Sequence, residues 1–180
     1  MKMGKAFNKF IIFFAVLFIL SSCGKMKPEE YFSIAVLNTN LIQGFSGTGF
    51  SRELQSPSVK LPENGGEPVP MNRTEVVNSK IAVIEDSYDK VKSLKITDET
   101  RDMIDASLKL YEYVLPVYKN EYMQLAGLYD SNAPEDQIQK QTMSIFDNYN
   151  KGFTDLYMKV ISTGKVYAEK NSIKVNWGGE

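Results

Sequence analysis

Histidine is absent from the 180-residue sequence, and cysteine occurs once, as Cys23. Without histidine the chain lacks the Ser-His-Asp and Cys-His arrangements and the usual proton shuttle at neutral pH. A single cysteine also excludes an internal disulfide and the zinc sites that combine several cysteine and histidine ligands. These absences argue against an enzyme, and we expect neither a metal site nor a cofactor.

The composition is that of one globular domain. Hydrophobic residues make up 43% of the chain and charged residues 24%, which fits a single folded unit. Removing residues 1–22 leaves 158 residues, enough to bury about 70% of the unfolded surface without a disulfide or metal. It also removes three lysines and no acid, so 18 basic side chains face 22 acidic ones, a net charge near −4. An acidic body argues against nucleic acid as a partner.

The first 22 residues have the layout of a secretory signal. A basic stretch ends at Lys9, an apolar run covers residues 10–20, and Ser21 and Ser22 precede Cys23. As a helix the run would span only about 16 Å at about 1.5 Å per residue. Because the hydrocarbon core of a bilayer is about 30 Å thick, the pattern predicts a cleaved signal peptide and not a permanent transmembrane helix.

The sequence Leu20-Ser21-Ser22-Cys23 resembles the lipobox of bacterial lipoproteins. The resemblance implies that the Cys23 sulfur carries a diacylglyceryl group, that cleavage falls between Ser22 and Cys23, and that the new amino terminus is acylated. Each buried CH₂ contributes about 0.8 kcal/mol, so two or three acyl chains hold a protein firmly on a membrane. The alternative, a buried structural cysteine, is not favoured because the following Gly24 and Lys25 offer no apolar surroundings.

Residues 23–27 then form a short lipidated tether. In enterobacterial relatives of this pathway an aspartate after the cysteine retains the protein at the inner membrane, whereas here Gly24 follows Cys23. By this resemblance we expect a lipid anchor in the outer membrane, with the body on the periplasmic or the surface side.

The rest of the chain, residues 28–180, predicts an all-α domain resembling a four-helix bundle. A first helix over 28–43 opens with Pro28 and two acids, and its apolar positions Tyr31, Ile34, Leu41 and Phe45 follow helical spacing only loosely. Residues 44–70 are rich in glycine, serine and proline, which predicts one long surface loop without helix. The glycines of this loop lack the spacing of a phosphate-binding motif.

Three further helices are expected from apolar stripes at steps of three and four residues. They cover 72–94, then 98–129 with Asp98 as the N-cap, then 135–171. Residues 173–177 alternate apolar and polar side chains, which predicts an extended tail laid on the bundle. The three stripes consist of Val77, Ile81, Ile84, Tyr88 and Val91; of Ile104, Leu108, Tyr111, Leu115, Tyr118, Tyr122, Leu125 and Tyr129; and of Ile138, Thr142, Ile145, Tyr149, Phe153, Leu156, Val160, Gly164 and Tyr167.

Pro116 falls inside the helix predicted over 98–129. Proline removes one backbone hydrogen bond and strains the preceding turn. The apolar stripe nevertheless keeps its phase from Leu115 to Tyr118, and a loop would have reset that phase. The sequence therefore predicts one kinked helix in preference to two short ones.

Candidate site residues are few. Tyr111, Tyr118, Tyr122 and Tyr129 share one helix face, where they could stack on a sugar or aromatic ligand or could belong to the core. The acids Glu85, Asp86 and Asp89 lack the loop of a calcium site, so we interpret them as a solvated face. The methionines Met103, Met123, Met143 and Met158 are interpreted as packing at the edges of the stripes.

With its lipobox, its tyrosine-rich third helix and its closing Tyr167-Ala168-Glu169-Lys170, the chain resembles helical surface lipoproteins of unknown function from spirochaetes and Bacteroidetes. That resemblance implies a fold and a location and carries over no catalytic residue. Our hypothesis is a non-enzymatic, membrane-anchored binding module whose partner is an envelope or host protein or a glycan. The alternative is a small hydrolase of glycans that uses two carboxylates alone, one with a raised pKa.

Overall fold

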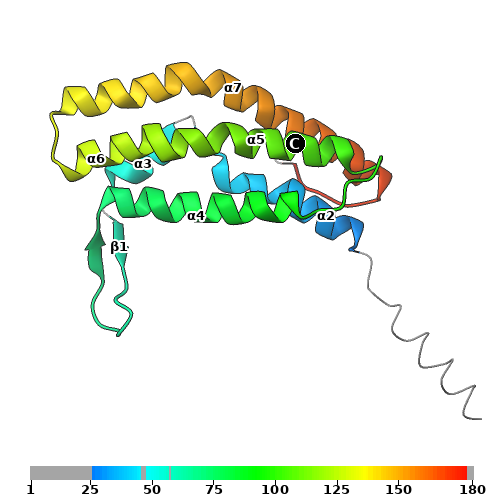
Figure 1. Ribbon diagram of the computed structural model, residues 1–180, viewed down its shortest axis with the longest axis horizontal. Coiled ribbons are helices and arrows are strands. Elements are labelled where there is room, and N and C mark those ends of the chain that lie inside the picture. Colours follow the sequence, from blue (N-terminus) through cyan, green and yellow to red (C-terminus); the bar gives the residue numbers. More distant parts are fainter. Residues whose placement is uncertain (1–25, 46–47, 57, 178–180) are drawn as a thin grey trace, which may run out of the picture.

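The protein is an elongated helical bundle with one projecting hairpin (Figure 1). The computed structural model describes residues 26–45, 48–56 and 58–177. In chain order the elements are α2 (Pro28–Ala35), the 3₁₀ turn η1 (Leu37–Ile42), α3 (Thr48–Gln55), β1 (Ser58–Lys60), β2 (Val69–Met71), α4 (Arg73–Lys92), α5 (Arg101–Val117), the π-helical turn η2 (Tyr118–Tyr122), α6 (Met123–Asp130) and α7 (Glu135–Lys170). The predicted all-α class is confirmed.

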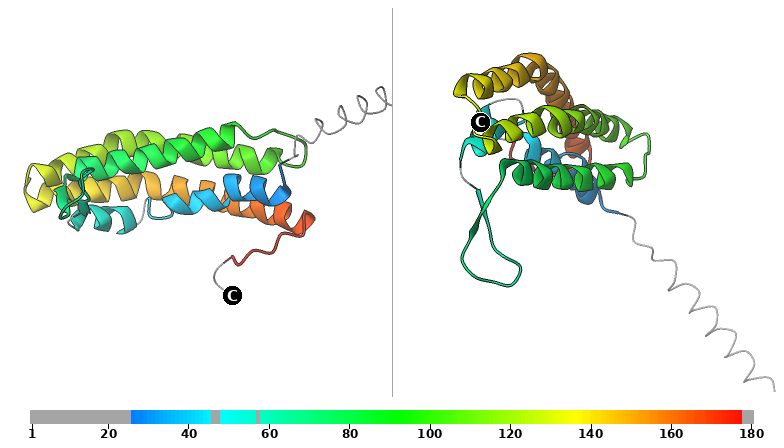
Figure 2. Two further views of the ribbon diagram at one scale, coloured as in Figure 1. Left: turned by 90° about the horizontal axis from the view of Figure 1, so that it is seen from below. Right: turned by 60° about the vertical axis from the view of Figure 1, so that its left-hand side comes forward.

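Helix α5 occupies the middle of the bundle, between α4 and α7 (Figures 1 and 2). The predicted stripe is confirmed, because Ile104, Tyr111 and Leu115 are buried. However, Leu110 and Val114 lie off that stripe and are 0% exposed. A helix with neighbours on several sides buries more than one face, which stripe counting does not reveal. In the described chain, no helix is both long and apolar enough to cross a bilayer.

The helix continues through Pro116, as predicted from the phase of the stripe, but a π-helical turn accompanies the proline. Helical backbone runs without a break from α5 through η2 into α6. Next to the proline, the side-chain amide of Asn120 donates a hydrogen bond of 2.8 Å to the Pro116 carbonyl. Leu115 and Tyr118 are 9% and 0% exposed. The widened turn thus accommodates the proline while both flanking side chains stay in the core.

Helix α7 is 36 residues long and bends over the bundle (Figure 1). Its predicted stripe is buried at six positions and half-buried at Thr142, Tyr149 and Leu156. Gly152 lies directly against the ring of Tyr113, and Gly164 lies against Val36. At both positions the missing side chain lets another residue of the core approach the helix.

The prediction that residues 44–70 form one loop without helix is wrong. Residues 48–55 form α3, which buries Phe50 and Leu54. Two glycines that suggested a loop serve close packing instead, because a Cβ on Gly49 would stand only 2.9 Å from the Gly44 Cα atom. The segment continues into the antiparallel hairpin of β1 and β2.

The first predicted helix is shorter than expected. Helix α2 ends at Ala35, and the backbone tightens into η1, where the buried Thr39 hydroxyl donates to the Val36 carbonyl at 2.6 Å. This change of winding shifts the buried face to Phe32, Ala35 and Ile42 and leaves Leu41 46% exposed. Of the predicted apolar positions, Leu41 is therefore wrong, whereas Phe45 is buried and Tyr31 and Ile34 are half-buried.

The predicted N-cap at Asp98 is also wrong. Helix α5 begins at Arg101, and Thr100 precedes it. The Thr100 hydroxyl accepts a bond of 2.9 Å from the Thr97 backbone N–H, so two threonines order the turn. Asp98 points into solvent. The extended tail is confirmed, since Ile173, Val175 and Trp177 pack on the core and the Trp177 ring meets the Phe32 ring edge-on at 5.7 Å.

Candidate binding groove

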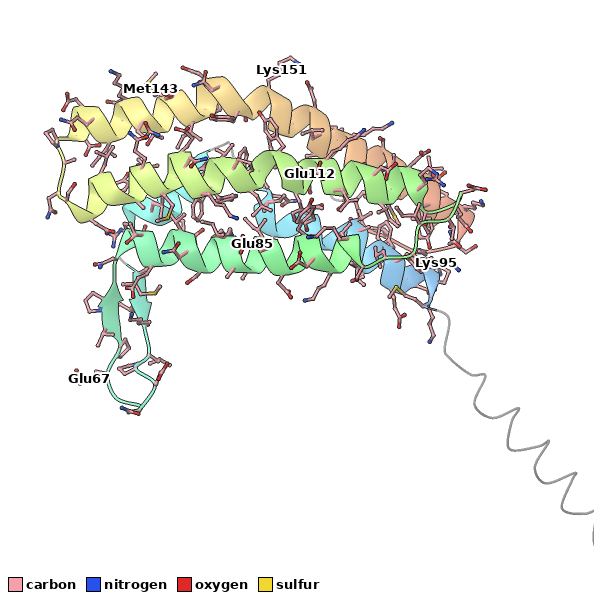
Figure 3. The ribbon with its side chains drawn as sticks, in the orientation of Figure 1. Glu67, Glu85, Lys95, Glu112, Met143 and Lys151 are labelled. Atoms are coloured by element: carbon pink, nitrogen blue, oxygen red, sulfur yellow. The ribbon has the colours of Figure 1, made fainter. Side chains whose placement is uncertain are left out.

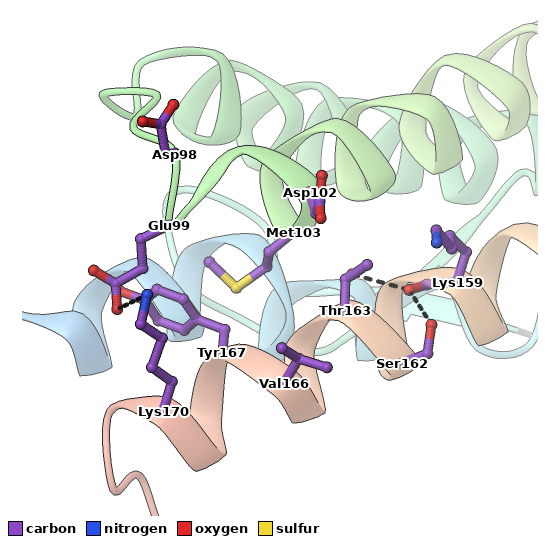
Figure 4. A pocket seen from close by; sticks show the side chains of 10 residues that line it. All are labelled: Asp98, Glu99, Asp102, Met103, Lys159, Ser162, Thr163, Val166, Tyr167 and Lys170. Atoms are coloured by element: carbon purple, nitrogen blue, oxygen red, sulfur yellow. Dashed lines mark hydrogen bonds and ion pairs between the residues drawn. The ribbon is translucent and has the colours of Figure 1, made fainter.

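A groove lies between the start of α5 and the last third of α7 (Figure 4). Both helix segments lie at the end of the bundle where the described chain begins (Figure 1). Its volume of about 360 Å³ falls within the range of small-molecule sites. The lining residues are Asp98, Glu99, Asp102, Met103, Lys159, Ser162, Thr163, Val166, Tyr167 and Lys170.

The floor of the groove is apolar and buried. Met103 from α5 and Tyr167 from α7 are 1% and 5% exposed. Burial, followed by the nearby carboxylate of Glu99, raises the pKa of the Tyr167 hydroxyl. Val166 stands at the rim with 66% of its surface exposed. Val166 is therefore the apolar surface that a ligand can cover, beside floor residues that the core already buries.

The two walls of the groove carry opposite charges. The α5 wall presents acids and the α7 wall presents lysines. Glu99 and Lys170 join the walls at one end, with 3.6 Å between carboxylate and ammonium, and the Asn171 amide donates to the same Glu99 oxygen at 3.0 Å. Asp102 and Lys159, by contrast, form no ion pair among the described residues. These two charges remain free for a ligand.

Two hydroxyls of α7 complete the polar lining. Ser162 and Thr163 both donate to the Lys159 carbonyl, each at 2.9 Å (Figure 4). Because these bonds use the hydroxyl protons, both oxygens retain lone pairs that can accept a hydrogen bond. The α7 wall thus offers one cation and two acceptors along a single helix face.

The tyrosines singled out from the sequence lie elsewhere and are not open to a ligand. Tyr111, Tyr118 and Tyr122 are 0% exposed, while Tyr129 is half-buried. Phe50 covers the column, with its ring 5.2 Å from that of Tyr118 and 4.9 Å from that of Tyr122. The core interpretation is therefore the one that the structure supports for the first three.

Burial controls the ionisation of the hydroxyl groups in this tyrosine column. It raises the pKa of Tyr111 to about 12 and that of Tyr118 well above its ordinary value. The Tyr122 hydroxyl donates to the Phe45 carbonyl, whereas the Tyr118 hydroxyl has no partner within the described chain. The tyrosines stay neutral and act as apolar rings at ordinary pH.

The acids of α4 form a solvated face, as interpreted from the sequence. Glu85 pairs with Lys119 at 2.6 Å, Asp86 with Lys90 at 2.5 Å, and Asp89 with Lys92 at 2.7 Å. Over the residues that the structure describes, no group of three or more carboxylate, histidine or cysteine side chains is placed to hold a metal ion.

The interpretation of the methionines needs correction. Met103 is buried and Met123 packs against the core, but Met143 and Met158 are 56% and 58% exposed. Helix α7 covers the bundle with one face only, so residues outside its stripe point to solvent.

The hydrolase alternative requires two buried carboxylates that face each other. Among the described side chains, no aspartate or glutamate is buried.

The expected lipidation site, Cys23 with cleavage after Ser22, lies outside the described residues. The groove was not predicted from the sequence. Asp102 and Lys159 fall off the apolar stripes, where charge is ordinary, so no sequence signal marked them. Comparison of the chain with protein families, curated proteins and solved structures finds no match.

Proposed function

We propose that the protein is a lipid-anchored binding protein of the bacterial cell envelope, and that the groove between α5 and α7 is its ligand site. The observation that carries the proposal is the pair of free, opposite charges, Asp102 and Lys159, on facing walls above an apolar floor. The lipobox-like sequence before Cys23 supports the anchor and the location.

The ligand that fits this lining carries one positive and one negative group. An ammonium suits Asp102, while a carboxylate or phosphate suits Lys159. Tyr167 is only 5% exposed, so the groove lacks an open aromatic face on which a sugar ring could stack. Free amino acids, peptide ends and phosphoethanolamine groups share the required chemistry.

The site is tested with the mature, detergent-solubilised lipoprotein by ligand-observed NMR. Diglycine and phosphoethanolamine serve as dipolar probes, and acetylated, amidated diglycine and sucrose serve as neutral ones. We expect saturable contacts for a dipolar probe, and a loss of at least tenfold in affinity for Asp102→Asn and for Lys159→Ala.

Matched controls are Asp147→Asn and Lys109→Ala, which change exposed charges outside the groove. Binding that survives both groove substitutions, or equal binding of the neutral probes, would overturn the site. The anchor is tested separately: Cys23→Ser should abolish acyl labelling and membrane retention while the helical circular dichroism stays unchanged.

A further inference from the structure

A two-stranded hairpin projects from the bundle beside the start of α4 (Figure 1). Its strands are exposed or half-buried along their whole length. A hairpin of this kind is marginally stable in water unless further strands or a packed face support it. The element is therefore one that a third strand would stabilise.

The two edges of this small sheet are not equivalent. Val59 lies opposite Pro70, and proline has no N–H to donate. Their pair must therefore be the non-hydrogen-bonded kind, in which the backbone polar groups of both residues point away from the partner strand. Val59 thus presents an N–H and a C=O on the outer edge of β1, whereas Pro70 presents only a C=O on the outer edge of β2. Proline blocks one edge, and the other stays open.

Apolar side chains surround the open edge. Val59 is 60% exposed, Leu61 74% and Val69 37%. Residues directly opposite each other share one face of a sheet, so the side chains of Val59 and Pro70 form a common apolar surface. Water covers this surface in the isolated chain, which makes its burial by an added strand favourable.

The connection between the strands carries two glutamates, Glu63 and Glu67, and Figure 3 labels Glu67 on it. Lys60 is neutralised by its ion pair with Glu75 of α4. Glu63 and Glu67, in the connection between the strands, form no ion pair with any described residue. The charge that complements the hairpin is therefore positive. A second copy of this chain, whose mature body is itself acidic, is not favoured by charge.

We propose that the outer edge of β1 is a docking site for an extended segment of a partner protein that alternates apolar and basic side chains. In strand addition the main-chain hydrogen bonds provide affinity and the side chains provide specificity. Here Val59 supplies the backbone groups, the Val59 and Pro70 side chains supply the apolar contact, and Glu63 and Glu67 select lysine or arginine. This site goes beyond the groove and is independent of it.

The test uses the mature lipoprotein in detergent and a fluorescent, end-blocked hexapeptide of alternating lysine and valine. Fluorescence anisotropy should show saturable binding, and hydrogen exchange should show protection of the Val59 amide. Val59→Pro removes the outward N–H without touching a ladder bond to β2, and we expect it to weaken binding at least tenfold. The double substitution Glu63→Lys and Glu67→Lys should do the same.

The matched controls separate edge recognition from general charge and from misfolding. Asp136→Lys with Asp147→Lys gives the same charge change on α7 and should change affinity less than twofold. Pro70→Val creates a second open edge and should retain the first site. Unchanged affinity in Val59→Pro, or equal binding of a backbone N-methylated hexapeptide, would overturn the proposal. So would a dimer of the chain that Val59→Pro dissociates, because the occupant would then be a second copy.

Discussion

Val36 and Gly164 are in such close contact that a Cβ on residue 164 would lie 2.9 Å from the Val36 Cγ2 atom. Val36 marks the point where α2 passes into η1, and Gly164 lies on the buried face of α7. The contact therefore joins the two ends of the described chain in sequence at one point of the core.

We expect Gly164→Ala to destabilise the protein by about 1–3 kcal/mol, the usual cost of overpacking, even though alanine favours helix. Gly127→Ala in α6 is the matched control, because the added Cβ would meet no atom within 4 Å apart from its chain neighbours and the backbone of its own helix. That substitution should be neutral or stabilising by up to about 1 kcal/mol. Urea denaturation of both variants measures their free energies of unfolding. Equal values for the two would contradict the close contact between Val36 and Gly164.

Leu115→Ala should cost about 2–5 kcal/mol in free energy of unfolding, because Leu115 is buried beside the π-helical turn. Lys119 is unsuitable as an exposed control, since it pairs with Glu85 at 2.6 Å. Gln124, exposed on α6, is the better choice, and Gln124→Ala should stay within about 0.5 kcal/mol. A cost below about 1 kcal/mol at Leu115 would be incompatible with a continuous helix packed on both sides of Pro116.

Asp130 should make the stability pH-dependent. Burial alone would raise its pKa, but bonds from the Thr74 and Arg73 backbone N–H groups, at 3.0 and 2.6 Å, hold the pKa below its ordinary value. The stabilisation is therefore present above the unfolded pKa of about 4 and is lost as pH falls through the lowered value. Asp130→Asn should cost about 0.5–2 kcal/mol at pH 7, in the range of helix caps.

The difference in free energy of unfolding between the native protein and Asp130→Asn should narrow as the pH falls from 5 to 3, as urea titrations would show. Asp147→Asn, on an exposed part of α7, should show no such change. Arg73 and Thr74 are the first two residues of α4. If the difference in free energy of unfolding stayed constant with pH, the Asp130 carboxylate would not stabilise the start of this helix.

Limited proteolysis should cut first in the connection between β1 and β2. Gly65 and Gly66 have φ values of 74° and 123°, and Glu63 and Glu67 are exposed beside them. A glutamate-specific protease should therefore cleave after Glu63 before it cleaves any helix, as mass spectrometry of the fragments would show, whereas Pro68 blocks cleavage after Glu67. Early cleavage at Glu53, in α3, would contradict the helical structure of that segment.

The sequence predicted most reliably those helices that bury a single face. In α7 the periodic spacing from Ile138 to Tyr167 reflects one-sided contact with the bundle, which a count of apolar residues can follow. Helix α5 has several neighbours, so Leu110 and Val114 lie off the predicted stripe although both are buried. Periodicity reveals a helix but does not reveal how many sides of it are covered.

The segment around α3 could not be predicted from composition because glycine has two uses. Gly49 suggested a break, yet its lack of a side chain lets the helix approach Gly44. The groove could not be predicted either. Its charges, Asp102 and Lys159, are 57 positions apart in sequence, and only the packing of α5 on α7 brings them to one site.

Helix α4 also works as a spacer. Its 20 residues span about 30 Å, and they separate the hairpin, beside Arg73, from the end of the bundle where the described chain begins (Figure 1). For a bundle that stands on its proposed lipid anchor, this height exceeds the Debye length of about 8 Å at physiological salt several times over. The electric potential of a charged bilayer would then have decayed before it reached Glu63 and Glu67. Recognition at the hairpin would not change with the charge of the lipids beneath it.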